Sequence, residues 1–265
     1  MPPASPIALI TGASSGIGAA FAQQLAAEGY DLIVVARRAA ALDQLAAEIR
    51  SKHAIAVETI AADLTCDDDV AALGKKLAST DRLALLINNA GFGARGLFFE
   101  ADPEHQDAMH RLHVLATERL TRAALPGMVA RRAGGIINVA SVAAFMQGPG
   151  NTSYCATKAW MVSFTEGLYL ELKSIGSPVI VQALCPGYTY TEFHNVMGVD
   201  RAKIIGESWW MSADRVVRES IRGLKQGKLF VIPGLRYRLL VALAKFVPRS
   251  LVLKATERRR GLEAD

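Results

Sequence analysis

The fold of this chain is decided by Ala8-Leu9-Ile10-Thr11-Gly12-Ala13-Ser14-Ser15-Gly16-Ile17-Gly18. A short apolar run passes directly into three glycines spaced G-x-x-x-G-x-G, where a helical pattern begins. Gly12 permits a tight turn, Gly16 lets the backbone approach a pyrophosphate, and Gly18 lets a helix pack closely on a strand. The N-terminus of such a helix offers free N–H groups and a partial positive charge to phosphates. An ordinary glycine-rich turn has the same composition, and it is the position directly after a first strand that favours a phosphate-binding loop.

The rest of the chain alternates short apolar runs with longer helical patterns. Strands are expected over 7–10, 31–35, 54–60, 83–87, 136–139, 179–184 and 228–232, and helices from the glycine loop to 27 and over 42–50, 70–77, 103–131, 153–173 and 213–224. Continuous apolar strands separated by helices indicate parallel strands buried on both faces. Right-handed crossovers then give an α/β fold, a doubly wound Rossmann-type parallel sheet flanked by helices on both faces. We expect a single domain over 1–232, with 233–265 as a C-terminal extension of it.

Composition indicates a globular protein, because 51% of the 265 residues are hydrophobic and no long polar tract interrupts them. The three cysteines, Cys66, Cys155 and Cys185, are odd in number and widely spaced, so we expect free thiols, no disulfide framework and no metal site. No basic leader segment and no run of 18 uncharged apolar residues are found. These features predict a cytoplasmic location.

Several short segments, taken in order, resemble the short-chain dehydrogenase/reductase family: the glycine loop, Asn88-Asn89-Ala90-Gly91, Ser141, Tyr154-x-x-x-Lys158 and Pro186-Gly187. The resemblance covers about 7–232. It implies a nicotinamide dinucleotide cofactor and an oxidoreductase activity. The cofactor-binding positions that it implies are Gly12, Ser14, Ser15, Gly16, Ile17, Gly18, Arg37, Arg38, Asp63, Leu64, Asn89, Ala90, Gly91, Tyr154, Lys158, Pro186, Gly187, Thr189 and Thr191.

The end of the second strand reads Ala36-Arg37-Arg38 and favours NADP(H) over NAD(H). An NAD site needs a carboxylate here for the ribose 2′-hydroxyl, and Ala36 offers none. Guanidinium groups pair well with a 2′-phosphate, and by resemblance Arg37 contacts it. Two solvated arginines at a helix start are the alternative. Asp63 has two interpretations of equal weight, a contact to the adenine edge implied by resemblance and a turn aspartate.

Ser141, Tyr154 and Lys158 are the expected catalytic residues. Hydride transfer to a carbonyl leaves negative charge on oxygen, so an acid must donate a proton, and tyrosine has an ordinary pKa of about 10. Tyr154 and Lys158 are four residues apart, which places them on one helical face. We expect the ammonium, together with the charge of the nicotinamide, to lower the pKa of the phenol. Ser141 follows the fifth expected strand, where its hydroxyl can polarise the substrate carbonyl.

His113 occupies a position where the family usually has an asparagine that holds a water linking the lysine to solvent. A histidine could hold that water or relay protons itself. The alternative, slightly favoured, is a packed and hydrogen-bonded core histidine.

The segment from Glu192 to Met211 resembles the mobile lid of the family, and Trp209 and Trp210 suggest an apolar pocket wall. Packing of the two tryptophans on the core is the equal alternative. The tail from Gly234 to Arg260 mixes leucines with a basic excess. A basic amphipathic helix can lie on an anionic membrane surface, and cover over the substrate pocket or a subunit contact are the favoured alternatives.

The sequence therefore predicts an NADP(H)-dependent oxidoreductase that acts on a small-molecule carbonyl or alcohol of apolar character. A catalytically silent NADP(H)-binding sensor on the same fold is the second hypothesis, and a scaffold protein with a basic surface is a third that only the tail favours. Nucleic-acid binding is not expected, since the basic excess falls in an amphipathic tail without a reading motif. The family resemblance implies a homodimer or homotetramer.

Overall fold

The computed structural model describes residues 5–94, 96–192, 206–248, 250–251 and 253. Its centre is a seven-stranded parallel sheet with the order β3-β2-β1-β4-β5-β6-β9. The strands are β1 (Ile7–Thr11), β2 (Asp31–Ala36), β3 (Val57–Ala61), β4 (Leu83–Asn88), β5 (Gly135–Val139), β6 (Ile180–Leu184) and β9 (Phe230–Val231). From the β1–β4 pair the strand order continues through β2 and β3 on one side and through β5, β6 and β9 on the other, which confirms the doubly wound fold.

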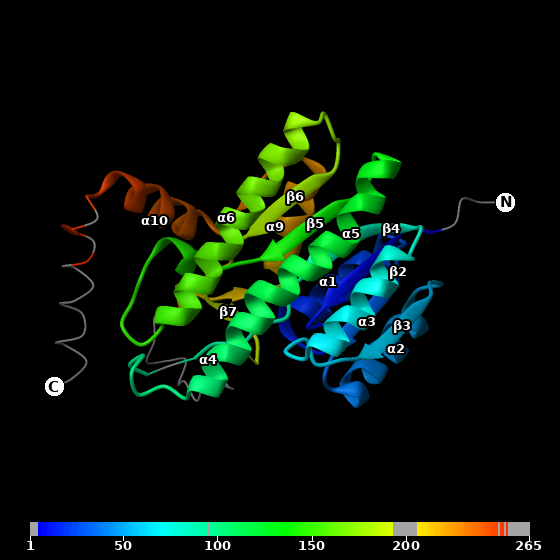
Figure 1. Cartoon of the computed structure of the whole chain (residues 1–265), viewed down its shortest axis with the longest axis horizontal. Helices are drawn as coiled ribbons and strands as arrows, with labels where there is room; N and C mark the ends of the chain where they lie inside the picture. The colour runs from blue at the N-terminus through cyan, green and yellow to red at the C-terminus, as the bar shows by residue number, and fades with distance from the viewer. Residues whose placement is uncertain (1–4, 95, 193–205, 249, 252, 254–265) are drawn as a thin grey trace.

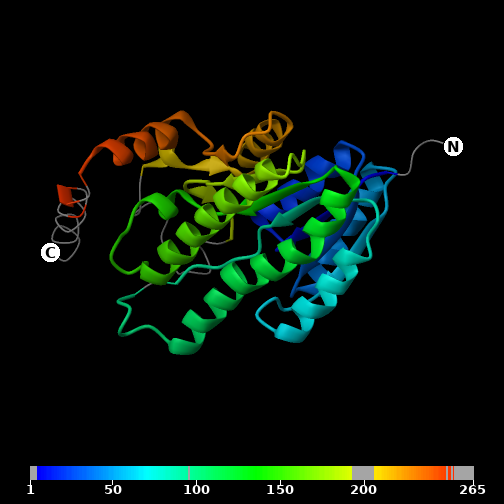
Figure 2. The ribbon, with the colours of Figure 1, turned by 45° about the horizontal axis from the view of Figure 1, so that its top comes forward.

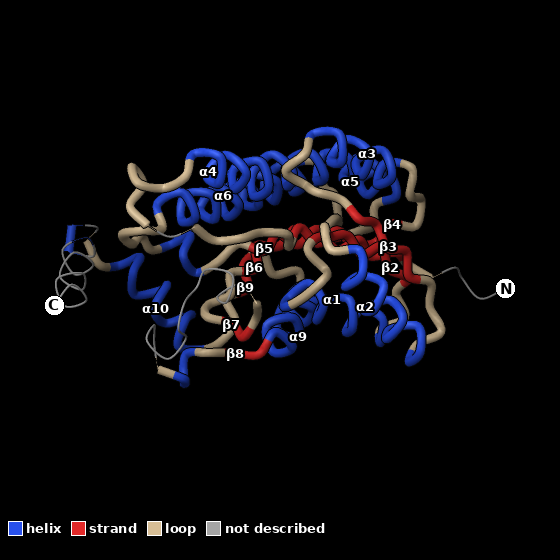
Figure 3. Tube along the Cα trace, turned by 90° about the horizontal axis from the view of Figure 1, so that it is seen from below, coloured by secondary structure: helices blue, strands red, loops and turns tan. Residues whose placement is uncertain are grey.

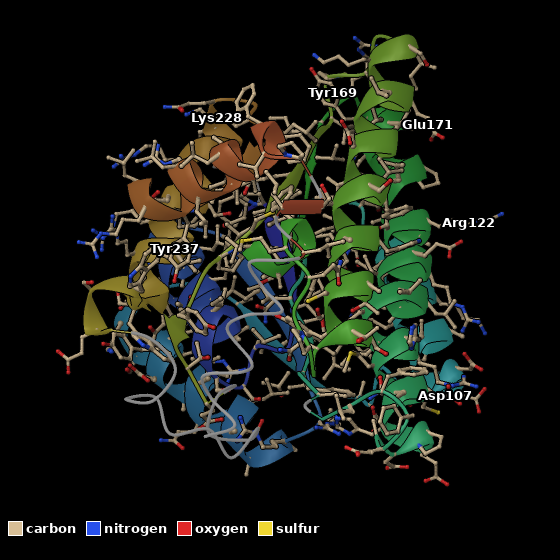
Figure 4. The ribbon with its side chains drawn as sticks, turned by 90° about the vertical axis from the view of Figure 1, so that its left-hand side faces the viewer. Asp107, Arg122, Tyr169, Glu171, Lys228 and Tyr237 are labelled. Carbon is tan, nitrogen blue, oxygen red and sulfur yellow. The ribbon has the colours of Figure 1, made fainter. Side chains whose placement is uncertain are left out.

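Helices cover both faces of the sheet (Figures 1 and 3). One layer holds α1 (Gly16–Ala27), α2 (Ala39–Lys52) and α9 (Ala213–Lys225), and the other holds α3 (Asp67–Ala78), α4 (Pro103–His110), α5 (Thr117–Arg131) and α6 (Thr152–Ser174). Asp107, Arg122 and Glu171 extend outward from this second layer (Figure 4). The two larger of three hydrophobic clusters among the described residues fill the spaces between the sheet and each layer.

A buried polar network links β4 and β5 to the helices α5 and α6. The amide nitrogen of Asn88 in β4 donates to Thr121 Oγ1 at 3.1 Å and to Asn138 Oδ1 at 2.8 Å, and the amide nitrogen of Asn138 in β5 donates to Thr165 Oγ1 at 2.9 Å. Buried polar groups are costly unless they are paired. The network therefore holds α5 and α6 in one register against the two central strands.

The helix expected over 103–131 is continuous but not uniformly α-helical. A π-helical segment, η1 (Arg111–Ala116), joins α4 to α5. Such segments are rare and are frequent at functional sites. His113 lies in the middle of η1 and is fully buried.

The chain continues beyond the sheet into α10 (Leu235–Phe246), which extends away from the body at the end opposite the N-terminus (Figures 1 and 2). Tyr237 and Val241 are buried on its inner face. The outer face exposes Leu235, Leu239, Leu243 and Phe246. Residues 249, 252 and 254–265 of the basic tail lie outside the described part.

Three local features differ from the expectations. The third strand begins at Val57 instead of 54, since its first predicted residues form a turn. A two-stranded parallel sheet of β7 (Thr189–Tyr190) and β8 (Met211–Ser212) was not expected, because strands this short carry no periodic pattern. Short 3₁₀ turns, η2 (Val142–Phe145) and η3 (Glu207–Trp209), were also unpredicted. Among the described residues, no helix combines the length and apolar character needed to cross a membrane.

Candidate active site

The glycine loop connects β1 to α1 at the point where the strand order reverses. Gly12 and Gly16 have φ values of 65° and 57°, in the left-handed region that favours glycine. A Cβ on Gly18 would lie 2.2 Å from the Gly12 carbonyl oxygen, so its close contact is with the end of the strand and the loop itself. Ser15, the N-cap of α1, makes no capping hydrogen bond with its side chain. The first N–H groups of α1 are thus available to an anion, which fits a dinucleotide phosphate.

Asn89 holds this loop against the end of β4. Its amide nitrogen donates to the carbonyls of Thr11 at 2.9 Å and Gly12 at 3.2 Å. The Thr11 hydroxyl in turn accepts from the backbone N–H groups of Asn89 and Ala90, each at 3.0 Å. The expected cofactor positions after β1 and β4 are therefore joined into one rigid unit.

Ser141, Tyr154 and Lys158 meet at the carboxyl edge of the sheet. The Ser141 hydroxyl is hydrogen-bonded to the phenol of Tyr154. Lys158 lies one turn after Tyr154 in α6, with Nζ 5.8 Å from the centre of the phenol ring. Nζ donates to the carbonyl of Val139 at 2.8 Å, which fixes the ammonium beneath the end of β5. The three side chains that the sequence singled out are thus brought together.

Burial dominates the electrostatics of this group. Burial raises the pKa of Tyr154 to about 12, and the hydrogen bond from Ser141 opposes this only in part. Burial also lowers the pKa of Lys158 to about 7. Desolvation thus disfavours the charged forms of both side chains in the chain without cofactor. There the phenol stays protonated at neutral pH. The expectation that the ammonium and the nicotinamide charge together lower the pKa of the phenol stays a prediction, because it includes the charge of a bound cofactor.

His113 packs behind the catalytic helix with both ring nitrogens engaged. Nε2 accepts from the backbone N–H of Phe92 at 3.2 Å, so Nδ1 carries the proton and donates to Thr157 Oγ1 at 2.9 Å. The Thr157 hydroxyl donates to the carbonyl of Tyr154 at 3.0 Å. Burial, followed by the nearby Lys158 charge, holds the pKa of His113 well below its usual value. The geometry supports the core-histidine interpretation, since a neutral ring with two direct partners has no free nitrogen for a water.

Close packing also limits what can stand beside His113. A Cβ on Gly91 would lie 2.7 Å from His113 Nε2 and 3.6 Å from Lys158 Nζ. The glycine of the segment 88–91 is therefore required by the histidine as well as by any bound cofactor.

Arg37 and Arg38 follow β2, and both are exposed. Arg38 folds back over the glycine loop, where its Nη2 donates to Ser14 Oγ at 3.1 Å and to Glu192 Oε2 at 2.8 Å. Within the described part of the chain, nothing pairs with the guanidinium of Arg37. Ala36 leaves no carboxylate at the end of the strand.

Asp63 forms a turn after β3. Its Oδ1 accepts from the backbone N–H and the hydroxyl of Thr65, at 3.0 and 2.8 Å. Asp63 Oδ1 therefore stabilises a turn, as one of the two interpretations expects, and a contact of Asp63 to adenine stays a prediction. The neighbouring Leu64 is buried in the core.

The loop after β6 completes the edge. The Pro186 carbonyl accepts from Val142 N at 3.0 Å and from the Ser141 hydroxyl at 3.4 Å. The Thr189 hydroxyl donates to the Gly187 carbonyl at 2.9 Å. A Cβ on Gly16 would lie 2.9 Å from Thr191 Cγ2, so this loop crosses directly over the glycine loop.

Tyr237 of α10 is the main site residue that sequence analysis missed (Figure 4). Its hydroxyl accepts from Tyr188 N at 3.0 Å and donates to the carbonyl of Trp209 at 2.8 Å. A Cβ on Gly187 would lie 2.1 Å from the Tyr237 ring. Tyr237 therefore joins the start of the expected lid to its end. No local pattern distinguished this tyrosine from others in an amphipathic tail.

The two lid tryptophans have different surroundings. Trp209 is half-buried and packs edge-on to Tyr237, with ring centres 5.3 Å apart. Trp210 is buried and stacks on Tyr190 at 5.2 Å. Both thus pack on the protein, as the second interpretation of them expected, while residues 193–205 of the lid lie outside the described part.

A cavity of about 10 Å³ adjoins Tyr154 and is bordered by Gln106 and Ser153. This is room for about one water, so a substrate needs more space than the described residues leave there. Among those residues, no group of three or more His, Cys, Asp or Glu side chains could hold a metal ion.

Comparison with known proteins points to one family. Residues 6–201 match the family model for short chain dehydrogenase. A very-long-chain 3-oxoacyl-CoA reductase from Bos taurus is 34% identical over 193 residues, which are 71% of this chain and 61% of that protein.

Solved structures agree over nearly the whole chain. A short-chain dehydrogenase from Sphingobium yanoikuyae in complex with NADPH has a TM-score of 0.82 at 36% identity, covering 98% of this chain and 96% of its own. A bulky-bulky ketone specific alcohol dehydrogenase from Comamonas testosteroni gives 0.78 at 32% identity, covering 98% and 94%. A short-chain dehydrogenase/reductase from Burkholderia phymatum in complex with NAD gives 0.80 at 26% identity, covering 90% and 92%.

Proposed function

The chain belongs to the short-chain dehydrogenase/reductase family of oxidoreductases, and from that premise we propose that it is a cytoplasmic, NADP(H)-dependent enzyme interconverting a carbonyl and a secondary alcohol on an apolar substrate. The observation that carries this proposal is the meeting of Ser141, Tyr154 and Lys158 in a fold whose glycine loop opens the helix α1. Relatives with NADPH and with NAD are both known, so the cofactor preference rests on this chain's own residues.

The residues have distinct roles in the proposed reaction. The nicotinamide, when bound, supplies or accepts the hydride. Ser141 holds and polarises the carbonyl oxygen, and Tyr154, protonated in the chain without cofactor, donates a proton to it. Lys158 lies below the phenol and, in its protonated form, favours the phenolate that forms as the proton leaves.

Tyr154→Phe tests the catalytic role. It keeps the ring and removes only the proton donor, so NADPH oxidation with a ketone should fall at least a hundredfold while the Kd for NADPH stays within about threefold. The control is Tyr169→Phe, on the same helix. Turnover by Tyr154→Phe within tenfold of wild type would rule out this tyrosine as the acid.

The proposed preference for NADP(H) rests on two exposed arginines and on the absence of a carboxylate at Ala36. A 2′-phosphate pairs with a guanidinium in two parallel hydrogen bonds, whereas a ribose hydroxyl gains little. Arg37→Ala should therefore raise the Kd for NADPH about tenfold and leave that for NADH nearly unchanged. Equal changes for both cofactors, measured by fluorescence titration, would remove the basis for the preference.

The substrate class is proposed from the relatives, which are named for bulky ketones and for 3-oxoacyl-CoA. An apolar ketone should therefore be reduced with a higher kcat/KM than a small polar one. A panel that pairs a bulky aromatic or long-chain ketone with acetone checks this order, and a preference for acetone would contradict it.

A catalytically silent sensor is the alternative on the same fold. The complete set of reacting residues argues against it. The same ketone panel separates the two. If wild type binds NADPH but turns over no more substrate than Tyr154→Phe on every ketone, the sensor hypothesis replaces the enzyme.

We also propose a peripheral membrane contact through α10. Its outer face exposes Leu235, Leu239, Leu243 and Phe246, with Arg238 exposed beside them, which is the arrangement of a helix lying on an anionic surface. Pelleting with anionic vesicles, lost in high salt and in Leu239→Glu, is the expected result. If the same variant instead lowers the mass of a homodimer or homotetramer in light scattering, the stripe is a subunit contact.

A further inference from the structure

The side chains of Arg38 and Glu192 close over the glycine loop from two sides of the cofactor groove. Arg38 follows β2, and Glu192 follows the loop after β6, so the two come from opposite halves of the sheet. Arg38 Nη2 lies 2.8 Å from Glu192 Oε2, and the same nitrogen donates to Ser14 Oγ at 3.1 Å. Glu192 is also hydrogen-bonded to the side chain of Ser15.

The backbone around Glu192 supports the same closure. Thr191 packs on the glycine loop so tightly that a Cβ on Gly16 would lie 2.9 Å from its Cγ2. Glu192 follows immediately and reaches Arg38 and Ser15 while staying half-exposed. Arg38 is also the main reason why the pKa of the Glu192 carboxyl is lowered.

The position of Arg38 gives this contact a consequence for cofactor choice. A 2′-phosphate bound beside Arg37 and Arg38 at the end of β2 draws on the Arg38 guanidinium that Glu192 already holds, and the two anions repel each other. A ribose 2′-hydroxyl makes no such demand. We infer that Glu192 is a specificity-determining residue that competes with the 2′-phosphate for Arg38, and so weakens binding of NADP(H) relative to NAD(H). The inference rests on the proposed site for the 2′-phosphate.

The size of the effect follows from exposure. The two side chains are 53% and 54% exposed. An ion pair this exposed raises the equilibrium constant for its own formation by a factor of at most about five. A phosphate dianion that bonds to a guanidinium through two hydrogen bonds is a stronger partner. NADP(H) therefore displaces Glu192, and displacement reduces its affinity by about that factor.

The test is the Kd of NADPH and of NADH for the full chain, measured by fluorescence titration at low salt. Glu192→Gln keeps the shape and removes the charge, so the Kd for NADPH should fall about three- to fivefold, while that for NADH changes less than twofold. The gain should shrink in 0.5 M salt and in an Arg38→Gln background. Glu118→Gln, an exposed carboxylate on α5 across the sheet, is the matched control and should change neither Kd.

Two results would overturn the inference. An equal change in both Kd values would mean that Glu192 acts on the shared part of the cofactor. A weaker Kd for NADPH alone would mean that Glu192 positions Arg38 for the phosphate instead of competing with it. The proposed preference for NADP(H) is tested separately and fails if wild type binds NADH more tightly than NADPH. The inference about Glu192 concerns only how the ratio of these two Kd values changes in Glu192→Gln.

Discussion

Lys158 makes the stability of the fold depend on pH in a way that one substitution removes. Burial lowers its pKa from 10.5 to about 7 in the folded chain. Between these values the unfolded chain holds a proton on this lysine that the folded chain lacks. Stability therefore rises with pH across that window, and below about pH 7 the folded state must instead carry the buried charge.

The magnitude follows from the two pKa values. One pKa unit corresponds to about 1.4 kcal/mol, so the full shift is worth about 5 kcal/mol. Between pH 7 and pH 9 the free energy of unfolding should increase by about 2 kcal/mol from this residue, since the folded lysine is still half-charged at the lower limit. Burial of the Cys185 thiol, which raises its pKa to about 12, acts in the opposite sense above pH 9, and this sets the upper limit.

Lys158→Met keeps the length of the side chain and removes the charge. The free energy of unfolding is measured by urea denaturation of the chain without cofactor at pH 7, 8 and 9. Its rise between pH 7 and pH 9 should be about 2 kcal/mol smaller in this variant than in wild type. Lys173→Met, an exposed lysine on the same helix, is the control and should follow wild type. Parallel curves for Lys158→Met and wild type would refute the reasoning, since they would mean that the buried lysine stays charged.

Tyr237→Phe removes both hydrogen bonds of the hydroxyl, so the free energy of unfolding should fall by about 1–3 kcal/mol in urea denaturation; an unchanged value would mean that the two backbone groups find other partners. Gly18→Ala should weaken NADPH binding about tenfold in a fluorescence titration, because its Cβ would lie 2.2 Å from a loop carbonyl. Binding within twofold of wild type would contradict this packing. Gly91→Ala should lower the melting temperature through its contact with His113, and adding His113→Ala should recover part of that loss in calorimetry. Strictly additive losses would show that the two positions are not coupled.

Much of the fold was predictable because it is encoded locally. The run from Ile7 to Ile10 is apolar, as a buried strand requires, and the glycines mark the turn and the helix start within a few residues. The spacing of Tyr154 and Lys158 fixes their common face in any helix, and Ser141 follows a strand that must end at the same edge. These relations need no knowledge of distant contacts.

The remaining features depend on packing between distant segments. The π-helical segment around His113 and the hydrogen bonds of this side chain to Phe92 and Thr157 have no counterpart in the local periodicity. The direction of the Tyr154 pKa depends on how fully neighbouring elements exclude water from the phenol. Tyr237 acquires its role from a loop about 50 positions earlier, and its own neighbours in the chain do not mark it.

The contact between Tyr237 and the loop after β6 also orders events in time. A ribosome makes the chain from the N-terminus at roughly 5–20 residues per second, so Tyr188 waits roughly 2–10 s for the residue, 49 positions later, that accepts its N–H. By then the residues of β1 to β6 and of the glycine loop have been made, while the base of the lid still lacks its cross-link. The two ends of the segment from Tyr188 to Trp209 can therefore be joined only after the chain has reached Tyr237.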